Sequence, residues 1–208
     1  PLYSEGANAA KRRGAQTTLY RILDVLVHLT APILSFTAEE IWQYLPGKAS
    51  RPKSVFLSQI PSPEPGFADA ALADKWERLL RERSEVLKAL EQARNGGIIG
   101  HSLDAKVVFE NRNGQGSLLP SLVQADQARL QDLLIVSQAA ESKEEAARAR
   151  GDEASYEAAL LNCLVKVSKA DGTKCERCWK YDVQVGADKN HPTVCARCAT
   201  VLNAGASA

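Results

Sequence analysis

Four cysteines in the last part of the chain have the types and spacing of metal ligands. They form two Cys-x-x-Cys pairs, and sixteen residues separate one pair from the other. Such a pair can turn its backbone so that both thiolates reach one ion, and four thiolates make the tetrahedral site that zinc prefers, with Zn–S distances of about 2.3 Å. We therefore predict one zinc ion bound by Cys175, Cys178, Cys195 and Cys198.

The predicted zinc site is structural and not catalytic. Four protein ligands leave no coordination position open for water or a substrate. The segment between the two pairs has few large apolar side chains. Metal binding must therefore supply most of its folding free energy, on the order of 10–16 kcal/mol in comparable modules. A redox dithiol is the alternative, and the double pair at this separation argues against it.

Basic and aromatic residues surround these cysteines in the sequence. The bases either neutralise the thiolate cluster or extend to the phosphates or bases of a nucleic acid. Arg177 and Trp179 flank Cys178, where a guanidinium plane and an indole would make a stacking site for an unpaired base. Packing of Trp179 against the cysteine turn is the alternative, and both stay open at this point. The basic residues near the cysteines are Lys174, Arg177, Lys180, Lys189 and Arg197.

Composition limits the class of protein. The chain has 208 residues, of which 45% are hydrophobic, and its formal net charge is +1. No apolar run approaches the ~18 residues of a membrane span. Residues 1–14 lack the apolar core of a signal peptide, so we expect a cytoplasmic protein. The remaining cysteine, Cys163, lies in the apolar run 160–167, which favours a small buried side chain.

Charge is distributed unevenly along the chain. Lys11, Arg12 and Arg13 form a basic cluster in the first helical stretch, whereas residues 139–157 carry an excess of acidic side chains. A polyanion is therefore steered to the ends of the chain and away from the acidic segment. The three basic residues are candidate phosphate contacts, with a solvated helix face as the alternative.

Two helices and a connection are predicted for the first third of the chain. Residues 8–30 should form a helix, and a second helix should begin at Thr37, which makes a capping box with Glu40. The proline-rich residues 48–67 indicate an extended connection that holds a short extended piece at 55–57. The predicted apolar face of the first helix consists of Leu19, Ile22, Leu23, Leu26 and Leu29.

A long helix and then a change of composition are predicted beyond this connection. The helix should cover residues 68–95 and end at Gly96-Gly97, as helices with left-handed caps commonly do. Its apolar positions are Leu72, Trp76, Leu79, Leu80, Val86, Leu87 and Leu90. The elements that follow are strands at 105–110, near Ile135 and at 160–169, a helix at 124–134, a polar loop at 143–152 and a turn at Asp171-Gly172.

These elements predict a mainly α chain with a small α/β unit and a four-cysteine zinc finger. We divide it into a partial helical bundle at 1–60, a long linking helix at 61–103, a small α/β domain at 104–170 and a zinc-binding module at 171–208. Because the first residues already belong to a bundle helix, we expect the first domain to be incomplete.

Three stretches resemble bacterial isoleucyl-tRNA synthetases. Residues 174–181 (KCERCWKY) and the second cysteine pair are similar to the C-terminal zinc module of these enzymes. Residues 29–42 (LTAPILSFTAEEIW) resemble the anticodon-binding bundle of class I synthetases for branched aliphatic amino acids. Residues 94–105 (RNGGIIGHSLDA) resemble the helix-to-strand passage of the same enzymes. The zinc motif distinguishes the isoleucyl enzymes from their valyl and leucyl relatives.

The resemblance implies a C-terminal fragment that recognises the anticodon region of isoleucine tRNA. The helical bundle would hold the anticodon stem and loop, and the zinc module would close on the loop. Single-stranded loops suit such recognition because their bases can stack on planar side chains. The candidate tRNA contacts are Arg177, Trp179, Lys180, Lys11, Arg12 and Arg13.

The resemblance also implies that the full-length protein is an ATP-dependent ligase that attaches isoleucine to its tRNA. ATP and Mg²⁺ would belong to a catalytic domain that we expect to be missing. Because the chain contains no methionine, the Lys-Met-Ser-Lys-Ser signature cannot be intact, and Ile98 stands where the His-Ile-Gly-His signature requires its first histidine. We therefore expect a monomeric, non-catalytic fragment.

Two rival functions stay open. Formamidopyrimidine-type DNA glycosylases carry a similar four-cysteine finger and use an N-terminal proline as nucleophile, a role that Pro1 imitates. Residues 2–5, however, lack the acidic, proline-rich start of that family. A zinc adaptor that binds protein is compatible with the small net charge. Binding to tRNA would weaken far more steeply with salt than binding to a protein groove.

Overall fold

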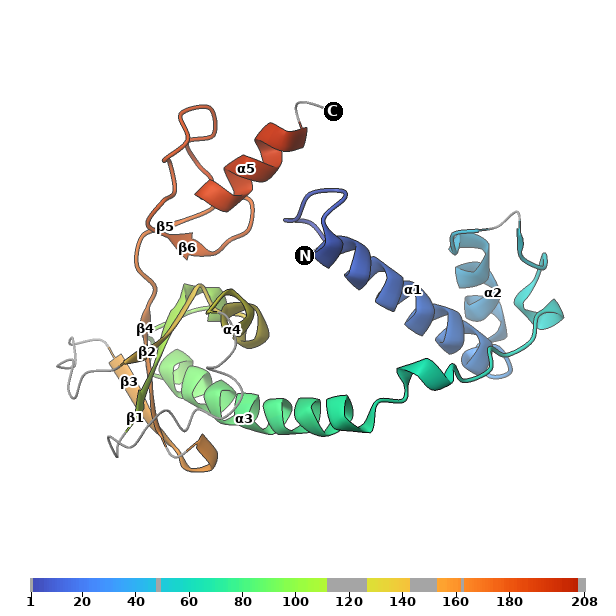
Figure 1. The fold of residues 1–208 in the computed structure, drawn as a ribbon, viewed down its shortest axis with the longest axis horizontal. Helices are drawn as coiled ribbons and strands as arrows, with labels where there is room; N and C mark the ends of the chain where they lie inside the picture. The colour runs from blue at the N-terminus through green and yellow to red at the C-terminus, as the bar shows by residue number, and fades with distance from the viewer. Residues whose placement is uncertain (1, 48–49, 112–126, 143–152, 162, 206–208) are drawn as a thin grey trace. The chain divides into compact units, whose positions relative to one another are not determined.

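A computed structural model of the chain describes residues 2–47, 50–111, 127–142, 153–161 and 163–205. Its helices and strands are labelled in Figure 1. The chain divides into two compact units, Asp69–Thr200 and Pro1–Ala68 together with Val201–Ala208. One hydrophobic core lies in each of the two units.

The first unit is built on two helices, α1 (Ala10–Thr30) and α2 (Ser35–Tyr44). The rings of His28 and Trp42 meet edge to face, with 5.2 Å between their centroids. His28 is satisfied at both nitrogens, since Nδ1 lies 2.7 Å from the Asp24 carbonyl oxygen and Nε2 lies 2.9 Å from the Ser58 hydroxyl. The core of this unit consists of Val27, Ala31, Ala38, Trp42, Leu45 and Val55.

Two local predictions for this unit are wrong. Helix α2 begins at Ser35 and not at Thr37, so Thr37 lies inside the helix and caps nothing. Residues 55–57 form a 3-10 turn (Val55–Leu57) instead of an extended piece, and a second such turn covers Pro65–Phe67. The first turn is held by Glu39, whose carboxylate accepts hydrogen bonds from the Ser54 hydroxyl at 2.7 Å and the Val55 N–H at 3.1 Å.

The predicted apolar face of α1 is exposed in this unit. Leu26 is 49% exposed and Ile22 52%, whereas Val27 and His28 are the buried residues of the helix. Periodicity correctly indicated the helix and an apolar face, but the residues of α1 that pack against α2 are Val27 and His28, which do not belong to that face.

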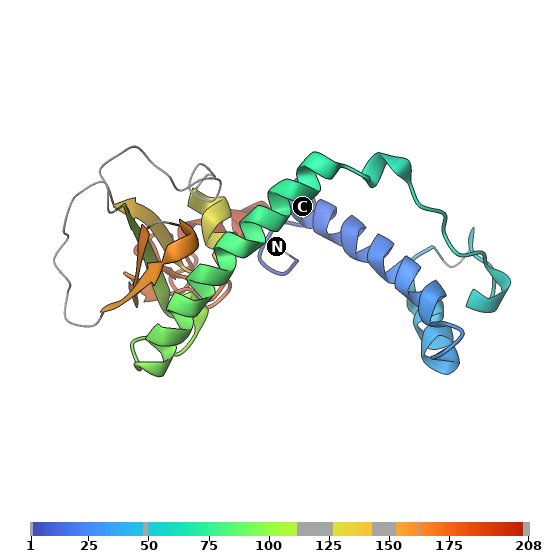
Figure 2. The same cartoon turned by 90° about the horizontal axis from the view of Figure 1, so that it is seen from below.

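The second unit contains a four-stranded sheet in the order β2-β1-β4-β3. Strand β1 pairs in parallel with β2 and antiparallel with β4, and β3 pairs antiparallel with β4. Helix α3 lies against the sheet, and Figure 2 shows its C-terminal half there while its N-terminal half extends beyond the strands. The strands are β1 (Ala105–Asn111), β2 (Gln138–Ser142), β3 (Glu153–Ala158) and β4 (Cys163–Lys169).

Helix α3 (Ala70–Asn95) confirms the predicted long helix. The Asp69 side chain caps it by accepting from the Leu72 N–H at 2.9 Å, and Gly97 ends it with a φ of +72°. Of the predicted apolar positions, Leu79, Val86 and Leu90 are buried against the sheet. Four others are exposed to solvent in this unit: Leu72, Trp76, Leu80 and Leu87.

Other elements differ from prediction in their bounds. Helix α4 (Gln127–Leu134) confirms the end of the predicted helix, whereas the φ of +60° at Ile135 excludes that residue from a strand, and β2 begins only at Gln138. Strand β3 was not predicted, and a 3-10 turn (Ala159–Leu161) precedes β4 where the predicted strand began at 160. The predicted loop at 143–152 lies outside the described residues. Among the described residues, no helix combines the length and apolar character needed to cross a bilayer.

Candidate metal centre and nucleic-acid interface

A two-stranded ribbon and a helix carry the four cysteines. Strands β5 (Thr173–Lys174) and β6 (Tyr181–Asp182) pair antiparallel, and α5 covers Ala196–Gly205. Gly172 confirms the predicted turn before β5, with a φ of +93°. A Cβ at this position would lie 2.4 Å from the Asp182 carbonyl, so only glycine fits.

The first cysteine pair forms a tight turn between the two strands. The Cys175 N–H donates to the Lys180 carbonyl at 2.9 Å, and the Trp179 N–H donates to the Cys175 carbonyl at 2.8 Å. Trp179 has a φ of +65°, a left-handed conformation that non-glycine residues seldom adopt. The backbone is therefore bent so that Cys175 and Cys178 present their sulfurs to one point.

The second pair is held against the first by backbone hydrogen bonds. The Cys195 N–H donates to the Cys175 sulfur at 3.3 Å, and the Glu176 N–H donates to the Thr193 carbonyl at 3.1 Å. Cys198 lies in the first turn of α5. Segments twenty residues apart in the chain thus converge on a single site.

The spacing of the four sulfurs fits a tetrahedral zinc ion. Zn–S bonds of about 2.3 Å in a tetrahedron place neighbouring sulfurs ~3.8 Å apart. The sulfurs of Cys178 and Cys195 are 3.8 Å apart, and all four ligand atoms lie within 4.8 Å of one another. Cys175, Cys195 and Cys198 are buried, so solvent has little access to the site. The predicted ligand set is therefore brought together.

Electrostatics explains why these sulfurs require a cation. Burial raises the pKa of Cys195 to about 12 and also raises the pKa of Cys198. Burial raises the pKa of Cys175 too, but hydrogen bonds from the backbone N–H groups of Cys178, Cys195 and Arg177 outweigh it and lower that pKa to about 6. Four thiolates cannot share this buried space alone, whereas a divalent cation lets all four ionise.

The zinc module is anchored to the sheet and α4. Lys180 Nζ lies 3.0 Å from the carboxylate of Asp132 on α4, and the Tyr181 N–H donates to the buried Ser137 hydroxyl at 2.7 Å. Besides three cysteines, the described residues of the module bury only Val194 and Ala199 as apolar side chains. The metal ligands therefore take the place of a hydrophobic core, as the sequence predicted.

The structure separates the roles of Trp179, Arg177 and Lys180. The Trp179 indole is 61% exposed, which argues against packing on the turn and leaves its face available. Arg177 Nη1 lies 3.6 Å from the Cys198 sulfur, and Lys180 pairs with Asp132. These contacts give Arg177 and Lys180 a structural role, and their contact with tRNA stays a prediction.

Lys174 lies beside the ring of Trp179, a contact that was not predicted from the sequence. Lys174 Nζ lies 5.9 Å from the centre of the indole. The two residues are five positions apart, and the turn of the first cysteine pair brings them together. A cation at this distance adds positive charge to the stacking surface.

The predicted basic cluster lies at the start of α1, at the other end of the sequence. Lys11, Arg12 and Arg13 occupy its first turns, and the first turn contains no acidic residue. Lys11 and Arg13 are exposed, and Arg12 is half-buried. The positive end of the helix dipole adds to their charge, so this end of α1 favours anions.

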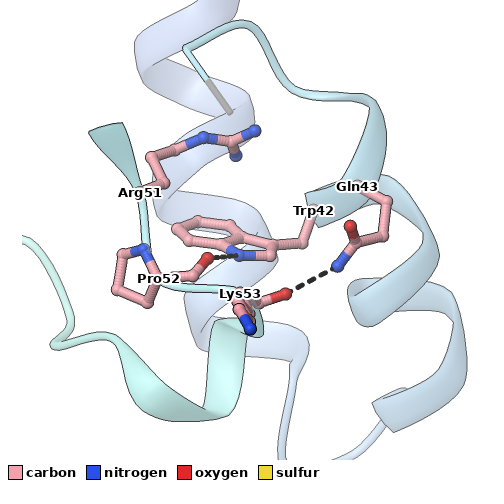
Figure 3. Close-up of a pocket in the computed structure, with 5 residues that line it drawn as sticks. All are labelled: Trp42, Gln43, Arg51, Pro52 and Lys53. Carbon is pink, nitrogen blue, oxygen red and sulfur yellow. Dashed lines mark hydrogen bonds between the residues drawn. The ribbon is translucent and has the colours of Figure 1, made fainter. Parts of the chain in front are cut away.

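A small cavity lies beside Trp42 in the first unit (Figure 3). The indole N–H donates to the Pro52 carbonyl at 3.0 Å, and the Gln43 amide donates to the Lys53 carbonyl at 2.8 Å. The Arg51 guanidinium lies 4.6 Å above the indole, and Nη2 donates to the Leu45 carbonyl. Its Nε and Nη1 are buried without hydrogen-bond partners among the described residues, which the stacking on Trp42 partly offsets. We interpret the contacts around this cavity as structural, because they hold residues 51–53 against α2.

Comparison with known families decides between the functions that the zinc site permits. Residues 1–109 match the family described as the anticodon-binding domain of tRNA ligase. The chain belongs to this anticodon-binding family. Residues 172–201 match the family described as a zinc finger found in FPG and IleRS. The finger alone therefore does not discriminate between those two kinds of protein, and the match over residues 1–109 does.

The anticodon-binding chain is also similar to isoleucine–tRNA ligases along almost its whole length. It is 44% identical over 201 residues to that of Syntrophotalea carbinolica, with 97% of this chain and 20% of that protein covered. It is 41% identical over 200 residues to that of Geobacter sulfurreducens, with 96% and 20% covered. It is 40% identical over 204 residues to that of Geobacillus kaustophilus, with 97% and 21% covered. The chain thus spans about a fifth of these relatives.

Proposed function

We propose that this chain is the tRNA-binding C-terminal part of an isoleucine–tRNA ligase and that its partner is isoleucine tRNA. The observation that carries the proposal is the match of residues 1–109 to the anticodon-binding family, in a chain 44% identical to such a ligase over 97% of its length. The zinc site and the exposed indole of Trp179 support it, since unpaired loop bases stack on such rings.

Zinc and ATP act in different parts of the full-length protein. The four cysteines hold one structural zinc ion, and the chemistry it supplies is the cross-linking of two segments that lack a core. ATP and Mg²⁺ act in the catalytic part of the ligase, which joins isoleucine to tRNA. The described residues contribute RNA binding and orientation. We propose that the chain acts as a monomer in the cytoplasm.

Filter binding of the zinc-loaded chain to an isoleucine tRNA transcript tests this proposal. The control RNAs are the same transcript with its anticodon loop replaced and a tRNA for another amino acid. We expect the unaltered transcript to bind more tightly than both controls, and its affinity to fall steeply between low and high salt as counterions are released. Equal binding of all three RNAs, or affinity that salt leaves unchanged, contradicts the proposal.

A further inference from the structure

The end of α4 and the start of β2 carry polar side chains that contact the zinc module. We call residues 132–138, which join the two elements, the α4–β2 junction. Gln138 binds the backbone of Asp171 at two points, because its Nε2 donates to the Asp171 carbonyl at 2.9 Å and its Oε1 accepts from the Asp171 N–H at 3.0 Å. Asp171 lies in the turn before β5, so this pair of hydrogen bonds fixes the first strand of the ribbon.

Ser137 holds the second strand of the ribbon. This residue is 4% exposed. Its hydroxyl accepts from the Tyr181 N–H at 2.7 Å and donates to the Leu103 carbonyl, in the turn before β1. A hydroxyl has one hydrogen, so these two partners together fix its orientation. The ion pair of Asp132 with Lys180 lies directly beside this contact along the chain, and the ribbon is therefore held at both strands.

Polar contacts, rather than apolar packing, connect the module to the sheet. Within the described part of the chain, the hydrophobic core of this unit contains no residue beyond Val167, and the buried Val194 and Ala199 of the module lie outside it. The hydrophobic effect has no direction, whereas a hydrogen bond weakens steeply when it is bent. The orientation of the module on the sheet therefore depends on the α4–β2 junction, to which the pair of Lys106 with Asp171 adds one contact from β1.

The backbone of the junction is strained at Ile135. Its φ of +60° is a left-handed value that a β-branched residue seldom adopts. The side chain is 51% exposed, so its own burial does not explain this conformation. Its neighbours Leu134 and Val136 are both buried in the core, and the Val136 N–H donates to the Gln131 carbonyl at 3.0 Å. Strained residues persist where their surroundings over-determine them, and here the strained turn directs the start of β2 to the ribbon.

Trp179 lies in the part of the module that these contacts control. It directly precedes Lys180 and Tyr181, the two residues of the second strand that the junction holds. Among the described residues, Trp179 and Ile135 are the two non-glycine residues with a left-handed φ. A module that could change its orientation on the sheet would keep its zinc ligands together, but it would present the exposed indole in many directions.

We propose that the α4–β2 junction fixes the direction in which the zinc module presents Trp179 to RNA, with Ser137 and Gln138 as positioning residues. Both act through the module and without contact with the RNA. This inference rests on the proposed function, because it assumes that the chain binds tRNA. A fixed indole lowers the ordering cost of binding. If only about a tenth of the molecules held the module correctly, the apparent affinity would fall about tenfold.

Substitutions in the junction of the zinc-loaded chain test this role. We expect Ser137→Ala and Gln138→Leu each to weaken binding of the isoleucine tRNA transcript about threefold, and the double variant about tenfold. The slope of log affinity against log salt should stay unchanged, because no phosphate contact is lost. Zinc content and resistance to a competing chelator should also stay unchanged. Ser137→Thr, which keeps the hydroxyl, should restore most of the affinity that Ser137→Ala loses.

Ser84→Ala and Gln43→Leu are the matched controls. The Ser84 hydroxyl donates to the Arg81 carbonyl on α3, and the Gln43 amide donates to Glu39 and to the Lys53 carbonyl in the first unit. Each control removes the same chemical groups as its counterpart without removing a contact of the module. We expect both to change the affinity by less than about twofold.

Residual dipolar couplings of the backbone amides measure the orientation of the module without RNA. In the unaltered chain, the couplings of residues 105–111 and 163–169 in the sheet and of residues 173–182 in the module should fit one alignment tensor. In the double variant, the couplings of the module should shrink or require a second tensor, while those of the sheet stay unchanged. If Ser137→Ala does not fold, Gln138→Leu at its half-buried position decides alone.

Three results overturn the positioning role of the junction while the proposed function stands. They are a folded double variant that binds RNA as tightly as the unaltered chain, a variant that loses zinc, and couplings that still fit one tensor although the affinity has fallen. If the unaltered chain itself does not bind the transcript, the proposed function fails and the positioning role fails with it.

Discussion

The left-handed backbone of Trp179 presents its indole to solvent beside the zinc ligands. The ring is 61% exposed, and Lys174 Nζ lies 5.9 Å from its centre. Because the ring contributes little to packing, we expect Trp179→Ala to weaken tRNA binding by ~1–3 kcal/mol, the usual value of one stacked base. The zinc content, measured by atomic absorption, should stay at one ion per chain.

Trp179→Phe is the matched control for this substitution, since it keeps an aromatic face at the same position. It should retain an affinity between those of the unaltered chain and the alanine variant. Loss of zinc in Trp179→Ala would show instead that the indole supports the cysteine turn, and the stacking role would then be withdrawn.

Cys163 is the cysteine that the zinc site does not use. It lies in β4, where it pairs with Asn111 of β1 and Ala158 of β3, and it is 4% exposed. Burial raises its pKa to about 11, so at pH 8 only about one thiol in a thousand is ionised. We expect iodoacetamide at pH 8 to leave Cys163 unmodified in the zinc-loaded chain and to modify it in guanidinium chloride, as peptide mass mapping would show. Rapid modification of the folded chain would indicate that β4 opens.

At the scale of single elements, the β5–β6 ribbon depends on Gly172. An alanine there would combine a φ of +93° with a Cβ 2.4 Å from the Asp182 carbonyl, so the turn must open. We expect Gly172→Ala to destabilise the module by more than the ~1 kcal/mol of a left-handed alanine alone. A competitive zinc chelator should remove the metal from this variant at lower concentration.

Gly14→Ala is the control glycine, because a Cβ at that helical position meets nothing within 4 Å. It should leave zinc affinity unchanged and stabilise α1 by up to about 1 kcal/mol. If Gly172→Ala held zinc as tightly as this control, the turn would be more adaptable than its contacts indicate.

Elements that depend on local spacing were predicted well, and those that depend on distant partners were not. The metal ligands followed from cysteine spacing, and α3 followed from its apolar period and its terminal glycines. Strand β3 was not predicted because its residues, EASYEA, are mostly polar, and it forms only by pairing with β4 at the edge of the sheet. Periodicity in α1 likewise reveals an apolar face without revealing what covers it.

The candidate RNA-binding residues show the same division. The cluster from Lys11 to Arg13 and the position of Trp179 were evident from the sequence. The pairing of Lys180 with Asp132 was not, because α4 lies almost fifty residues earlier in the chain.

At the scale of the whole molecule, the metal and the two hydrophobic cores stabilise different parts of the chain. The module has almost no apolar core among its described residues, whereas α1 has 21 residues and α3 has 26, packed in or beside cores that contain no metal ligand. We expect a strong zinc chelator to unfold the module and to leave most of the helical circular dichroism unchanged. The affinity for tRNA should fall at the same time, because Trp179 would lose its fixed position.

Hydrogen exchange locates this loss along the chain. The amides of Cys175, Trp179 and Tyr181 donate to partners within or beside the cysteine turn, so they should lose protection on chelation. Residues 79–93 of α3, which pack on the sheet, should keep theirs. Added zinc should restore both protection and binding, and the same chelator already saturated with zinc serves as the control. Protection that persists around Trp179 after the metal has been removed would mean that the turn folds without zinc, and the structural role of the ion would then be wrong.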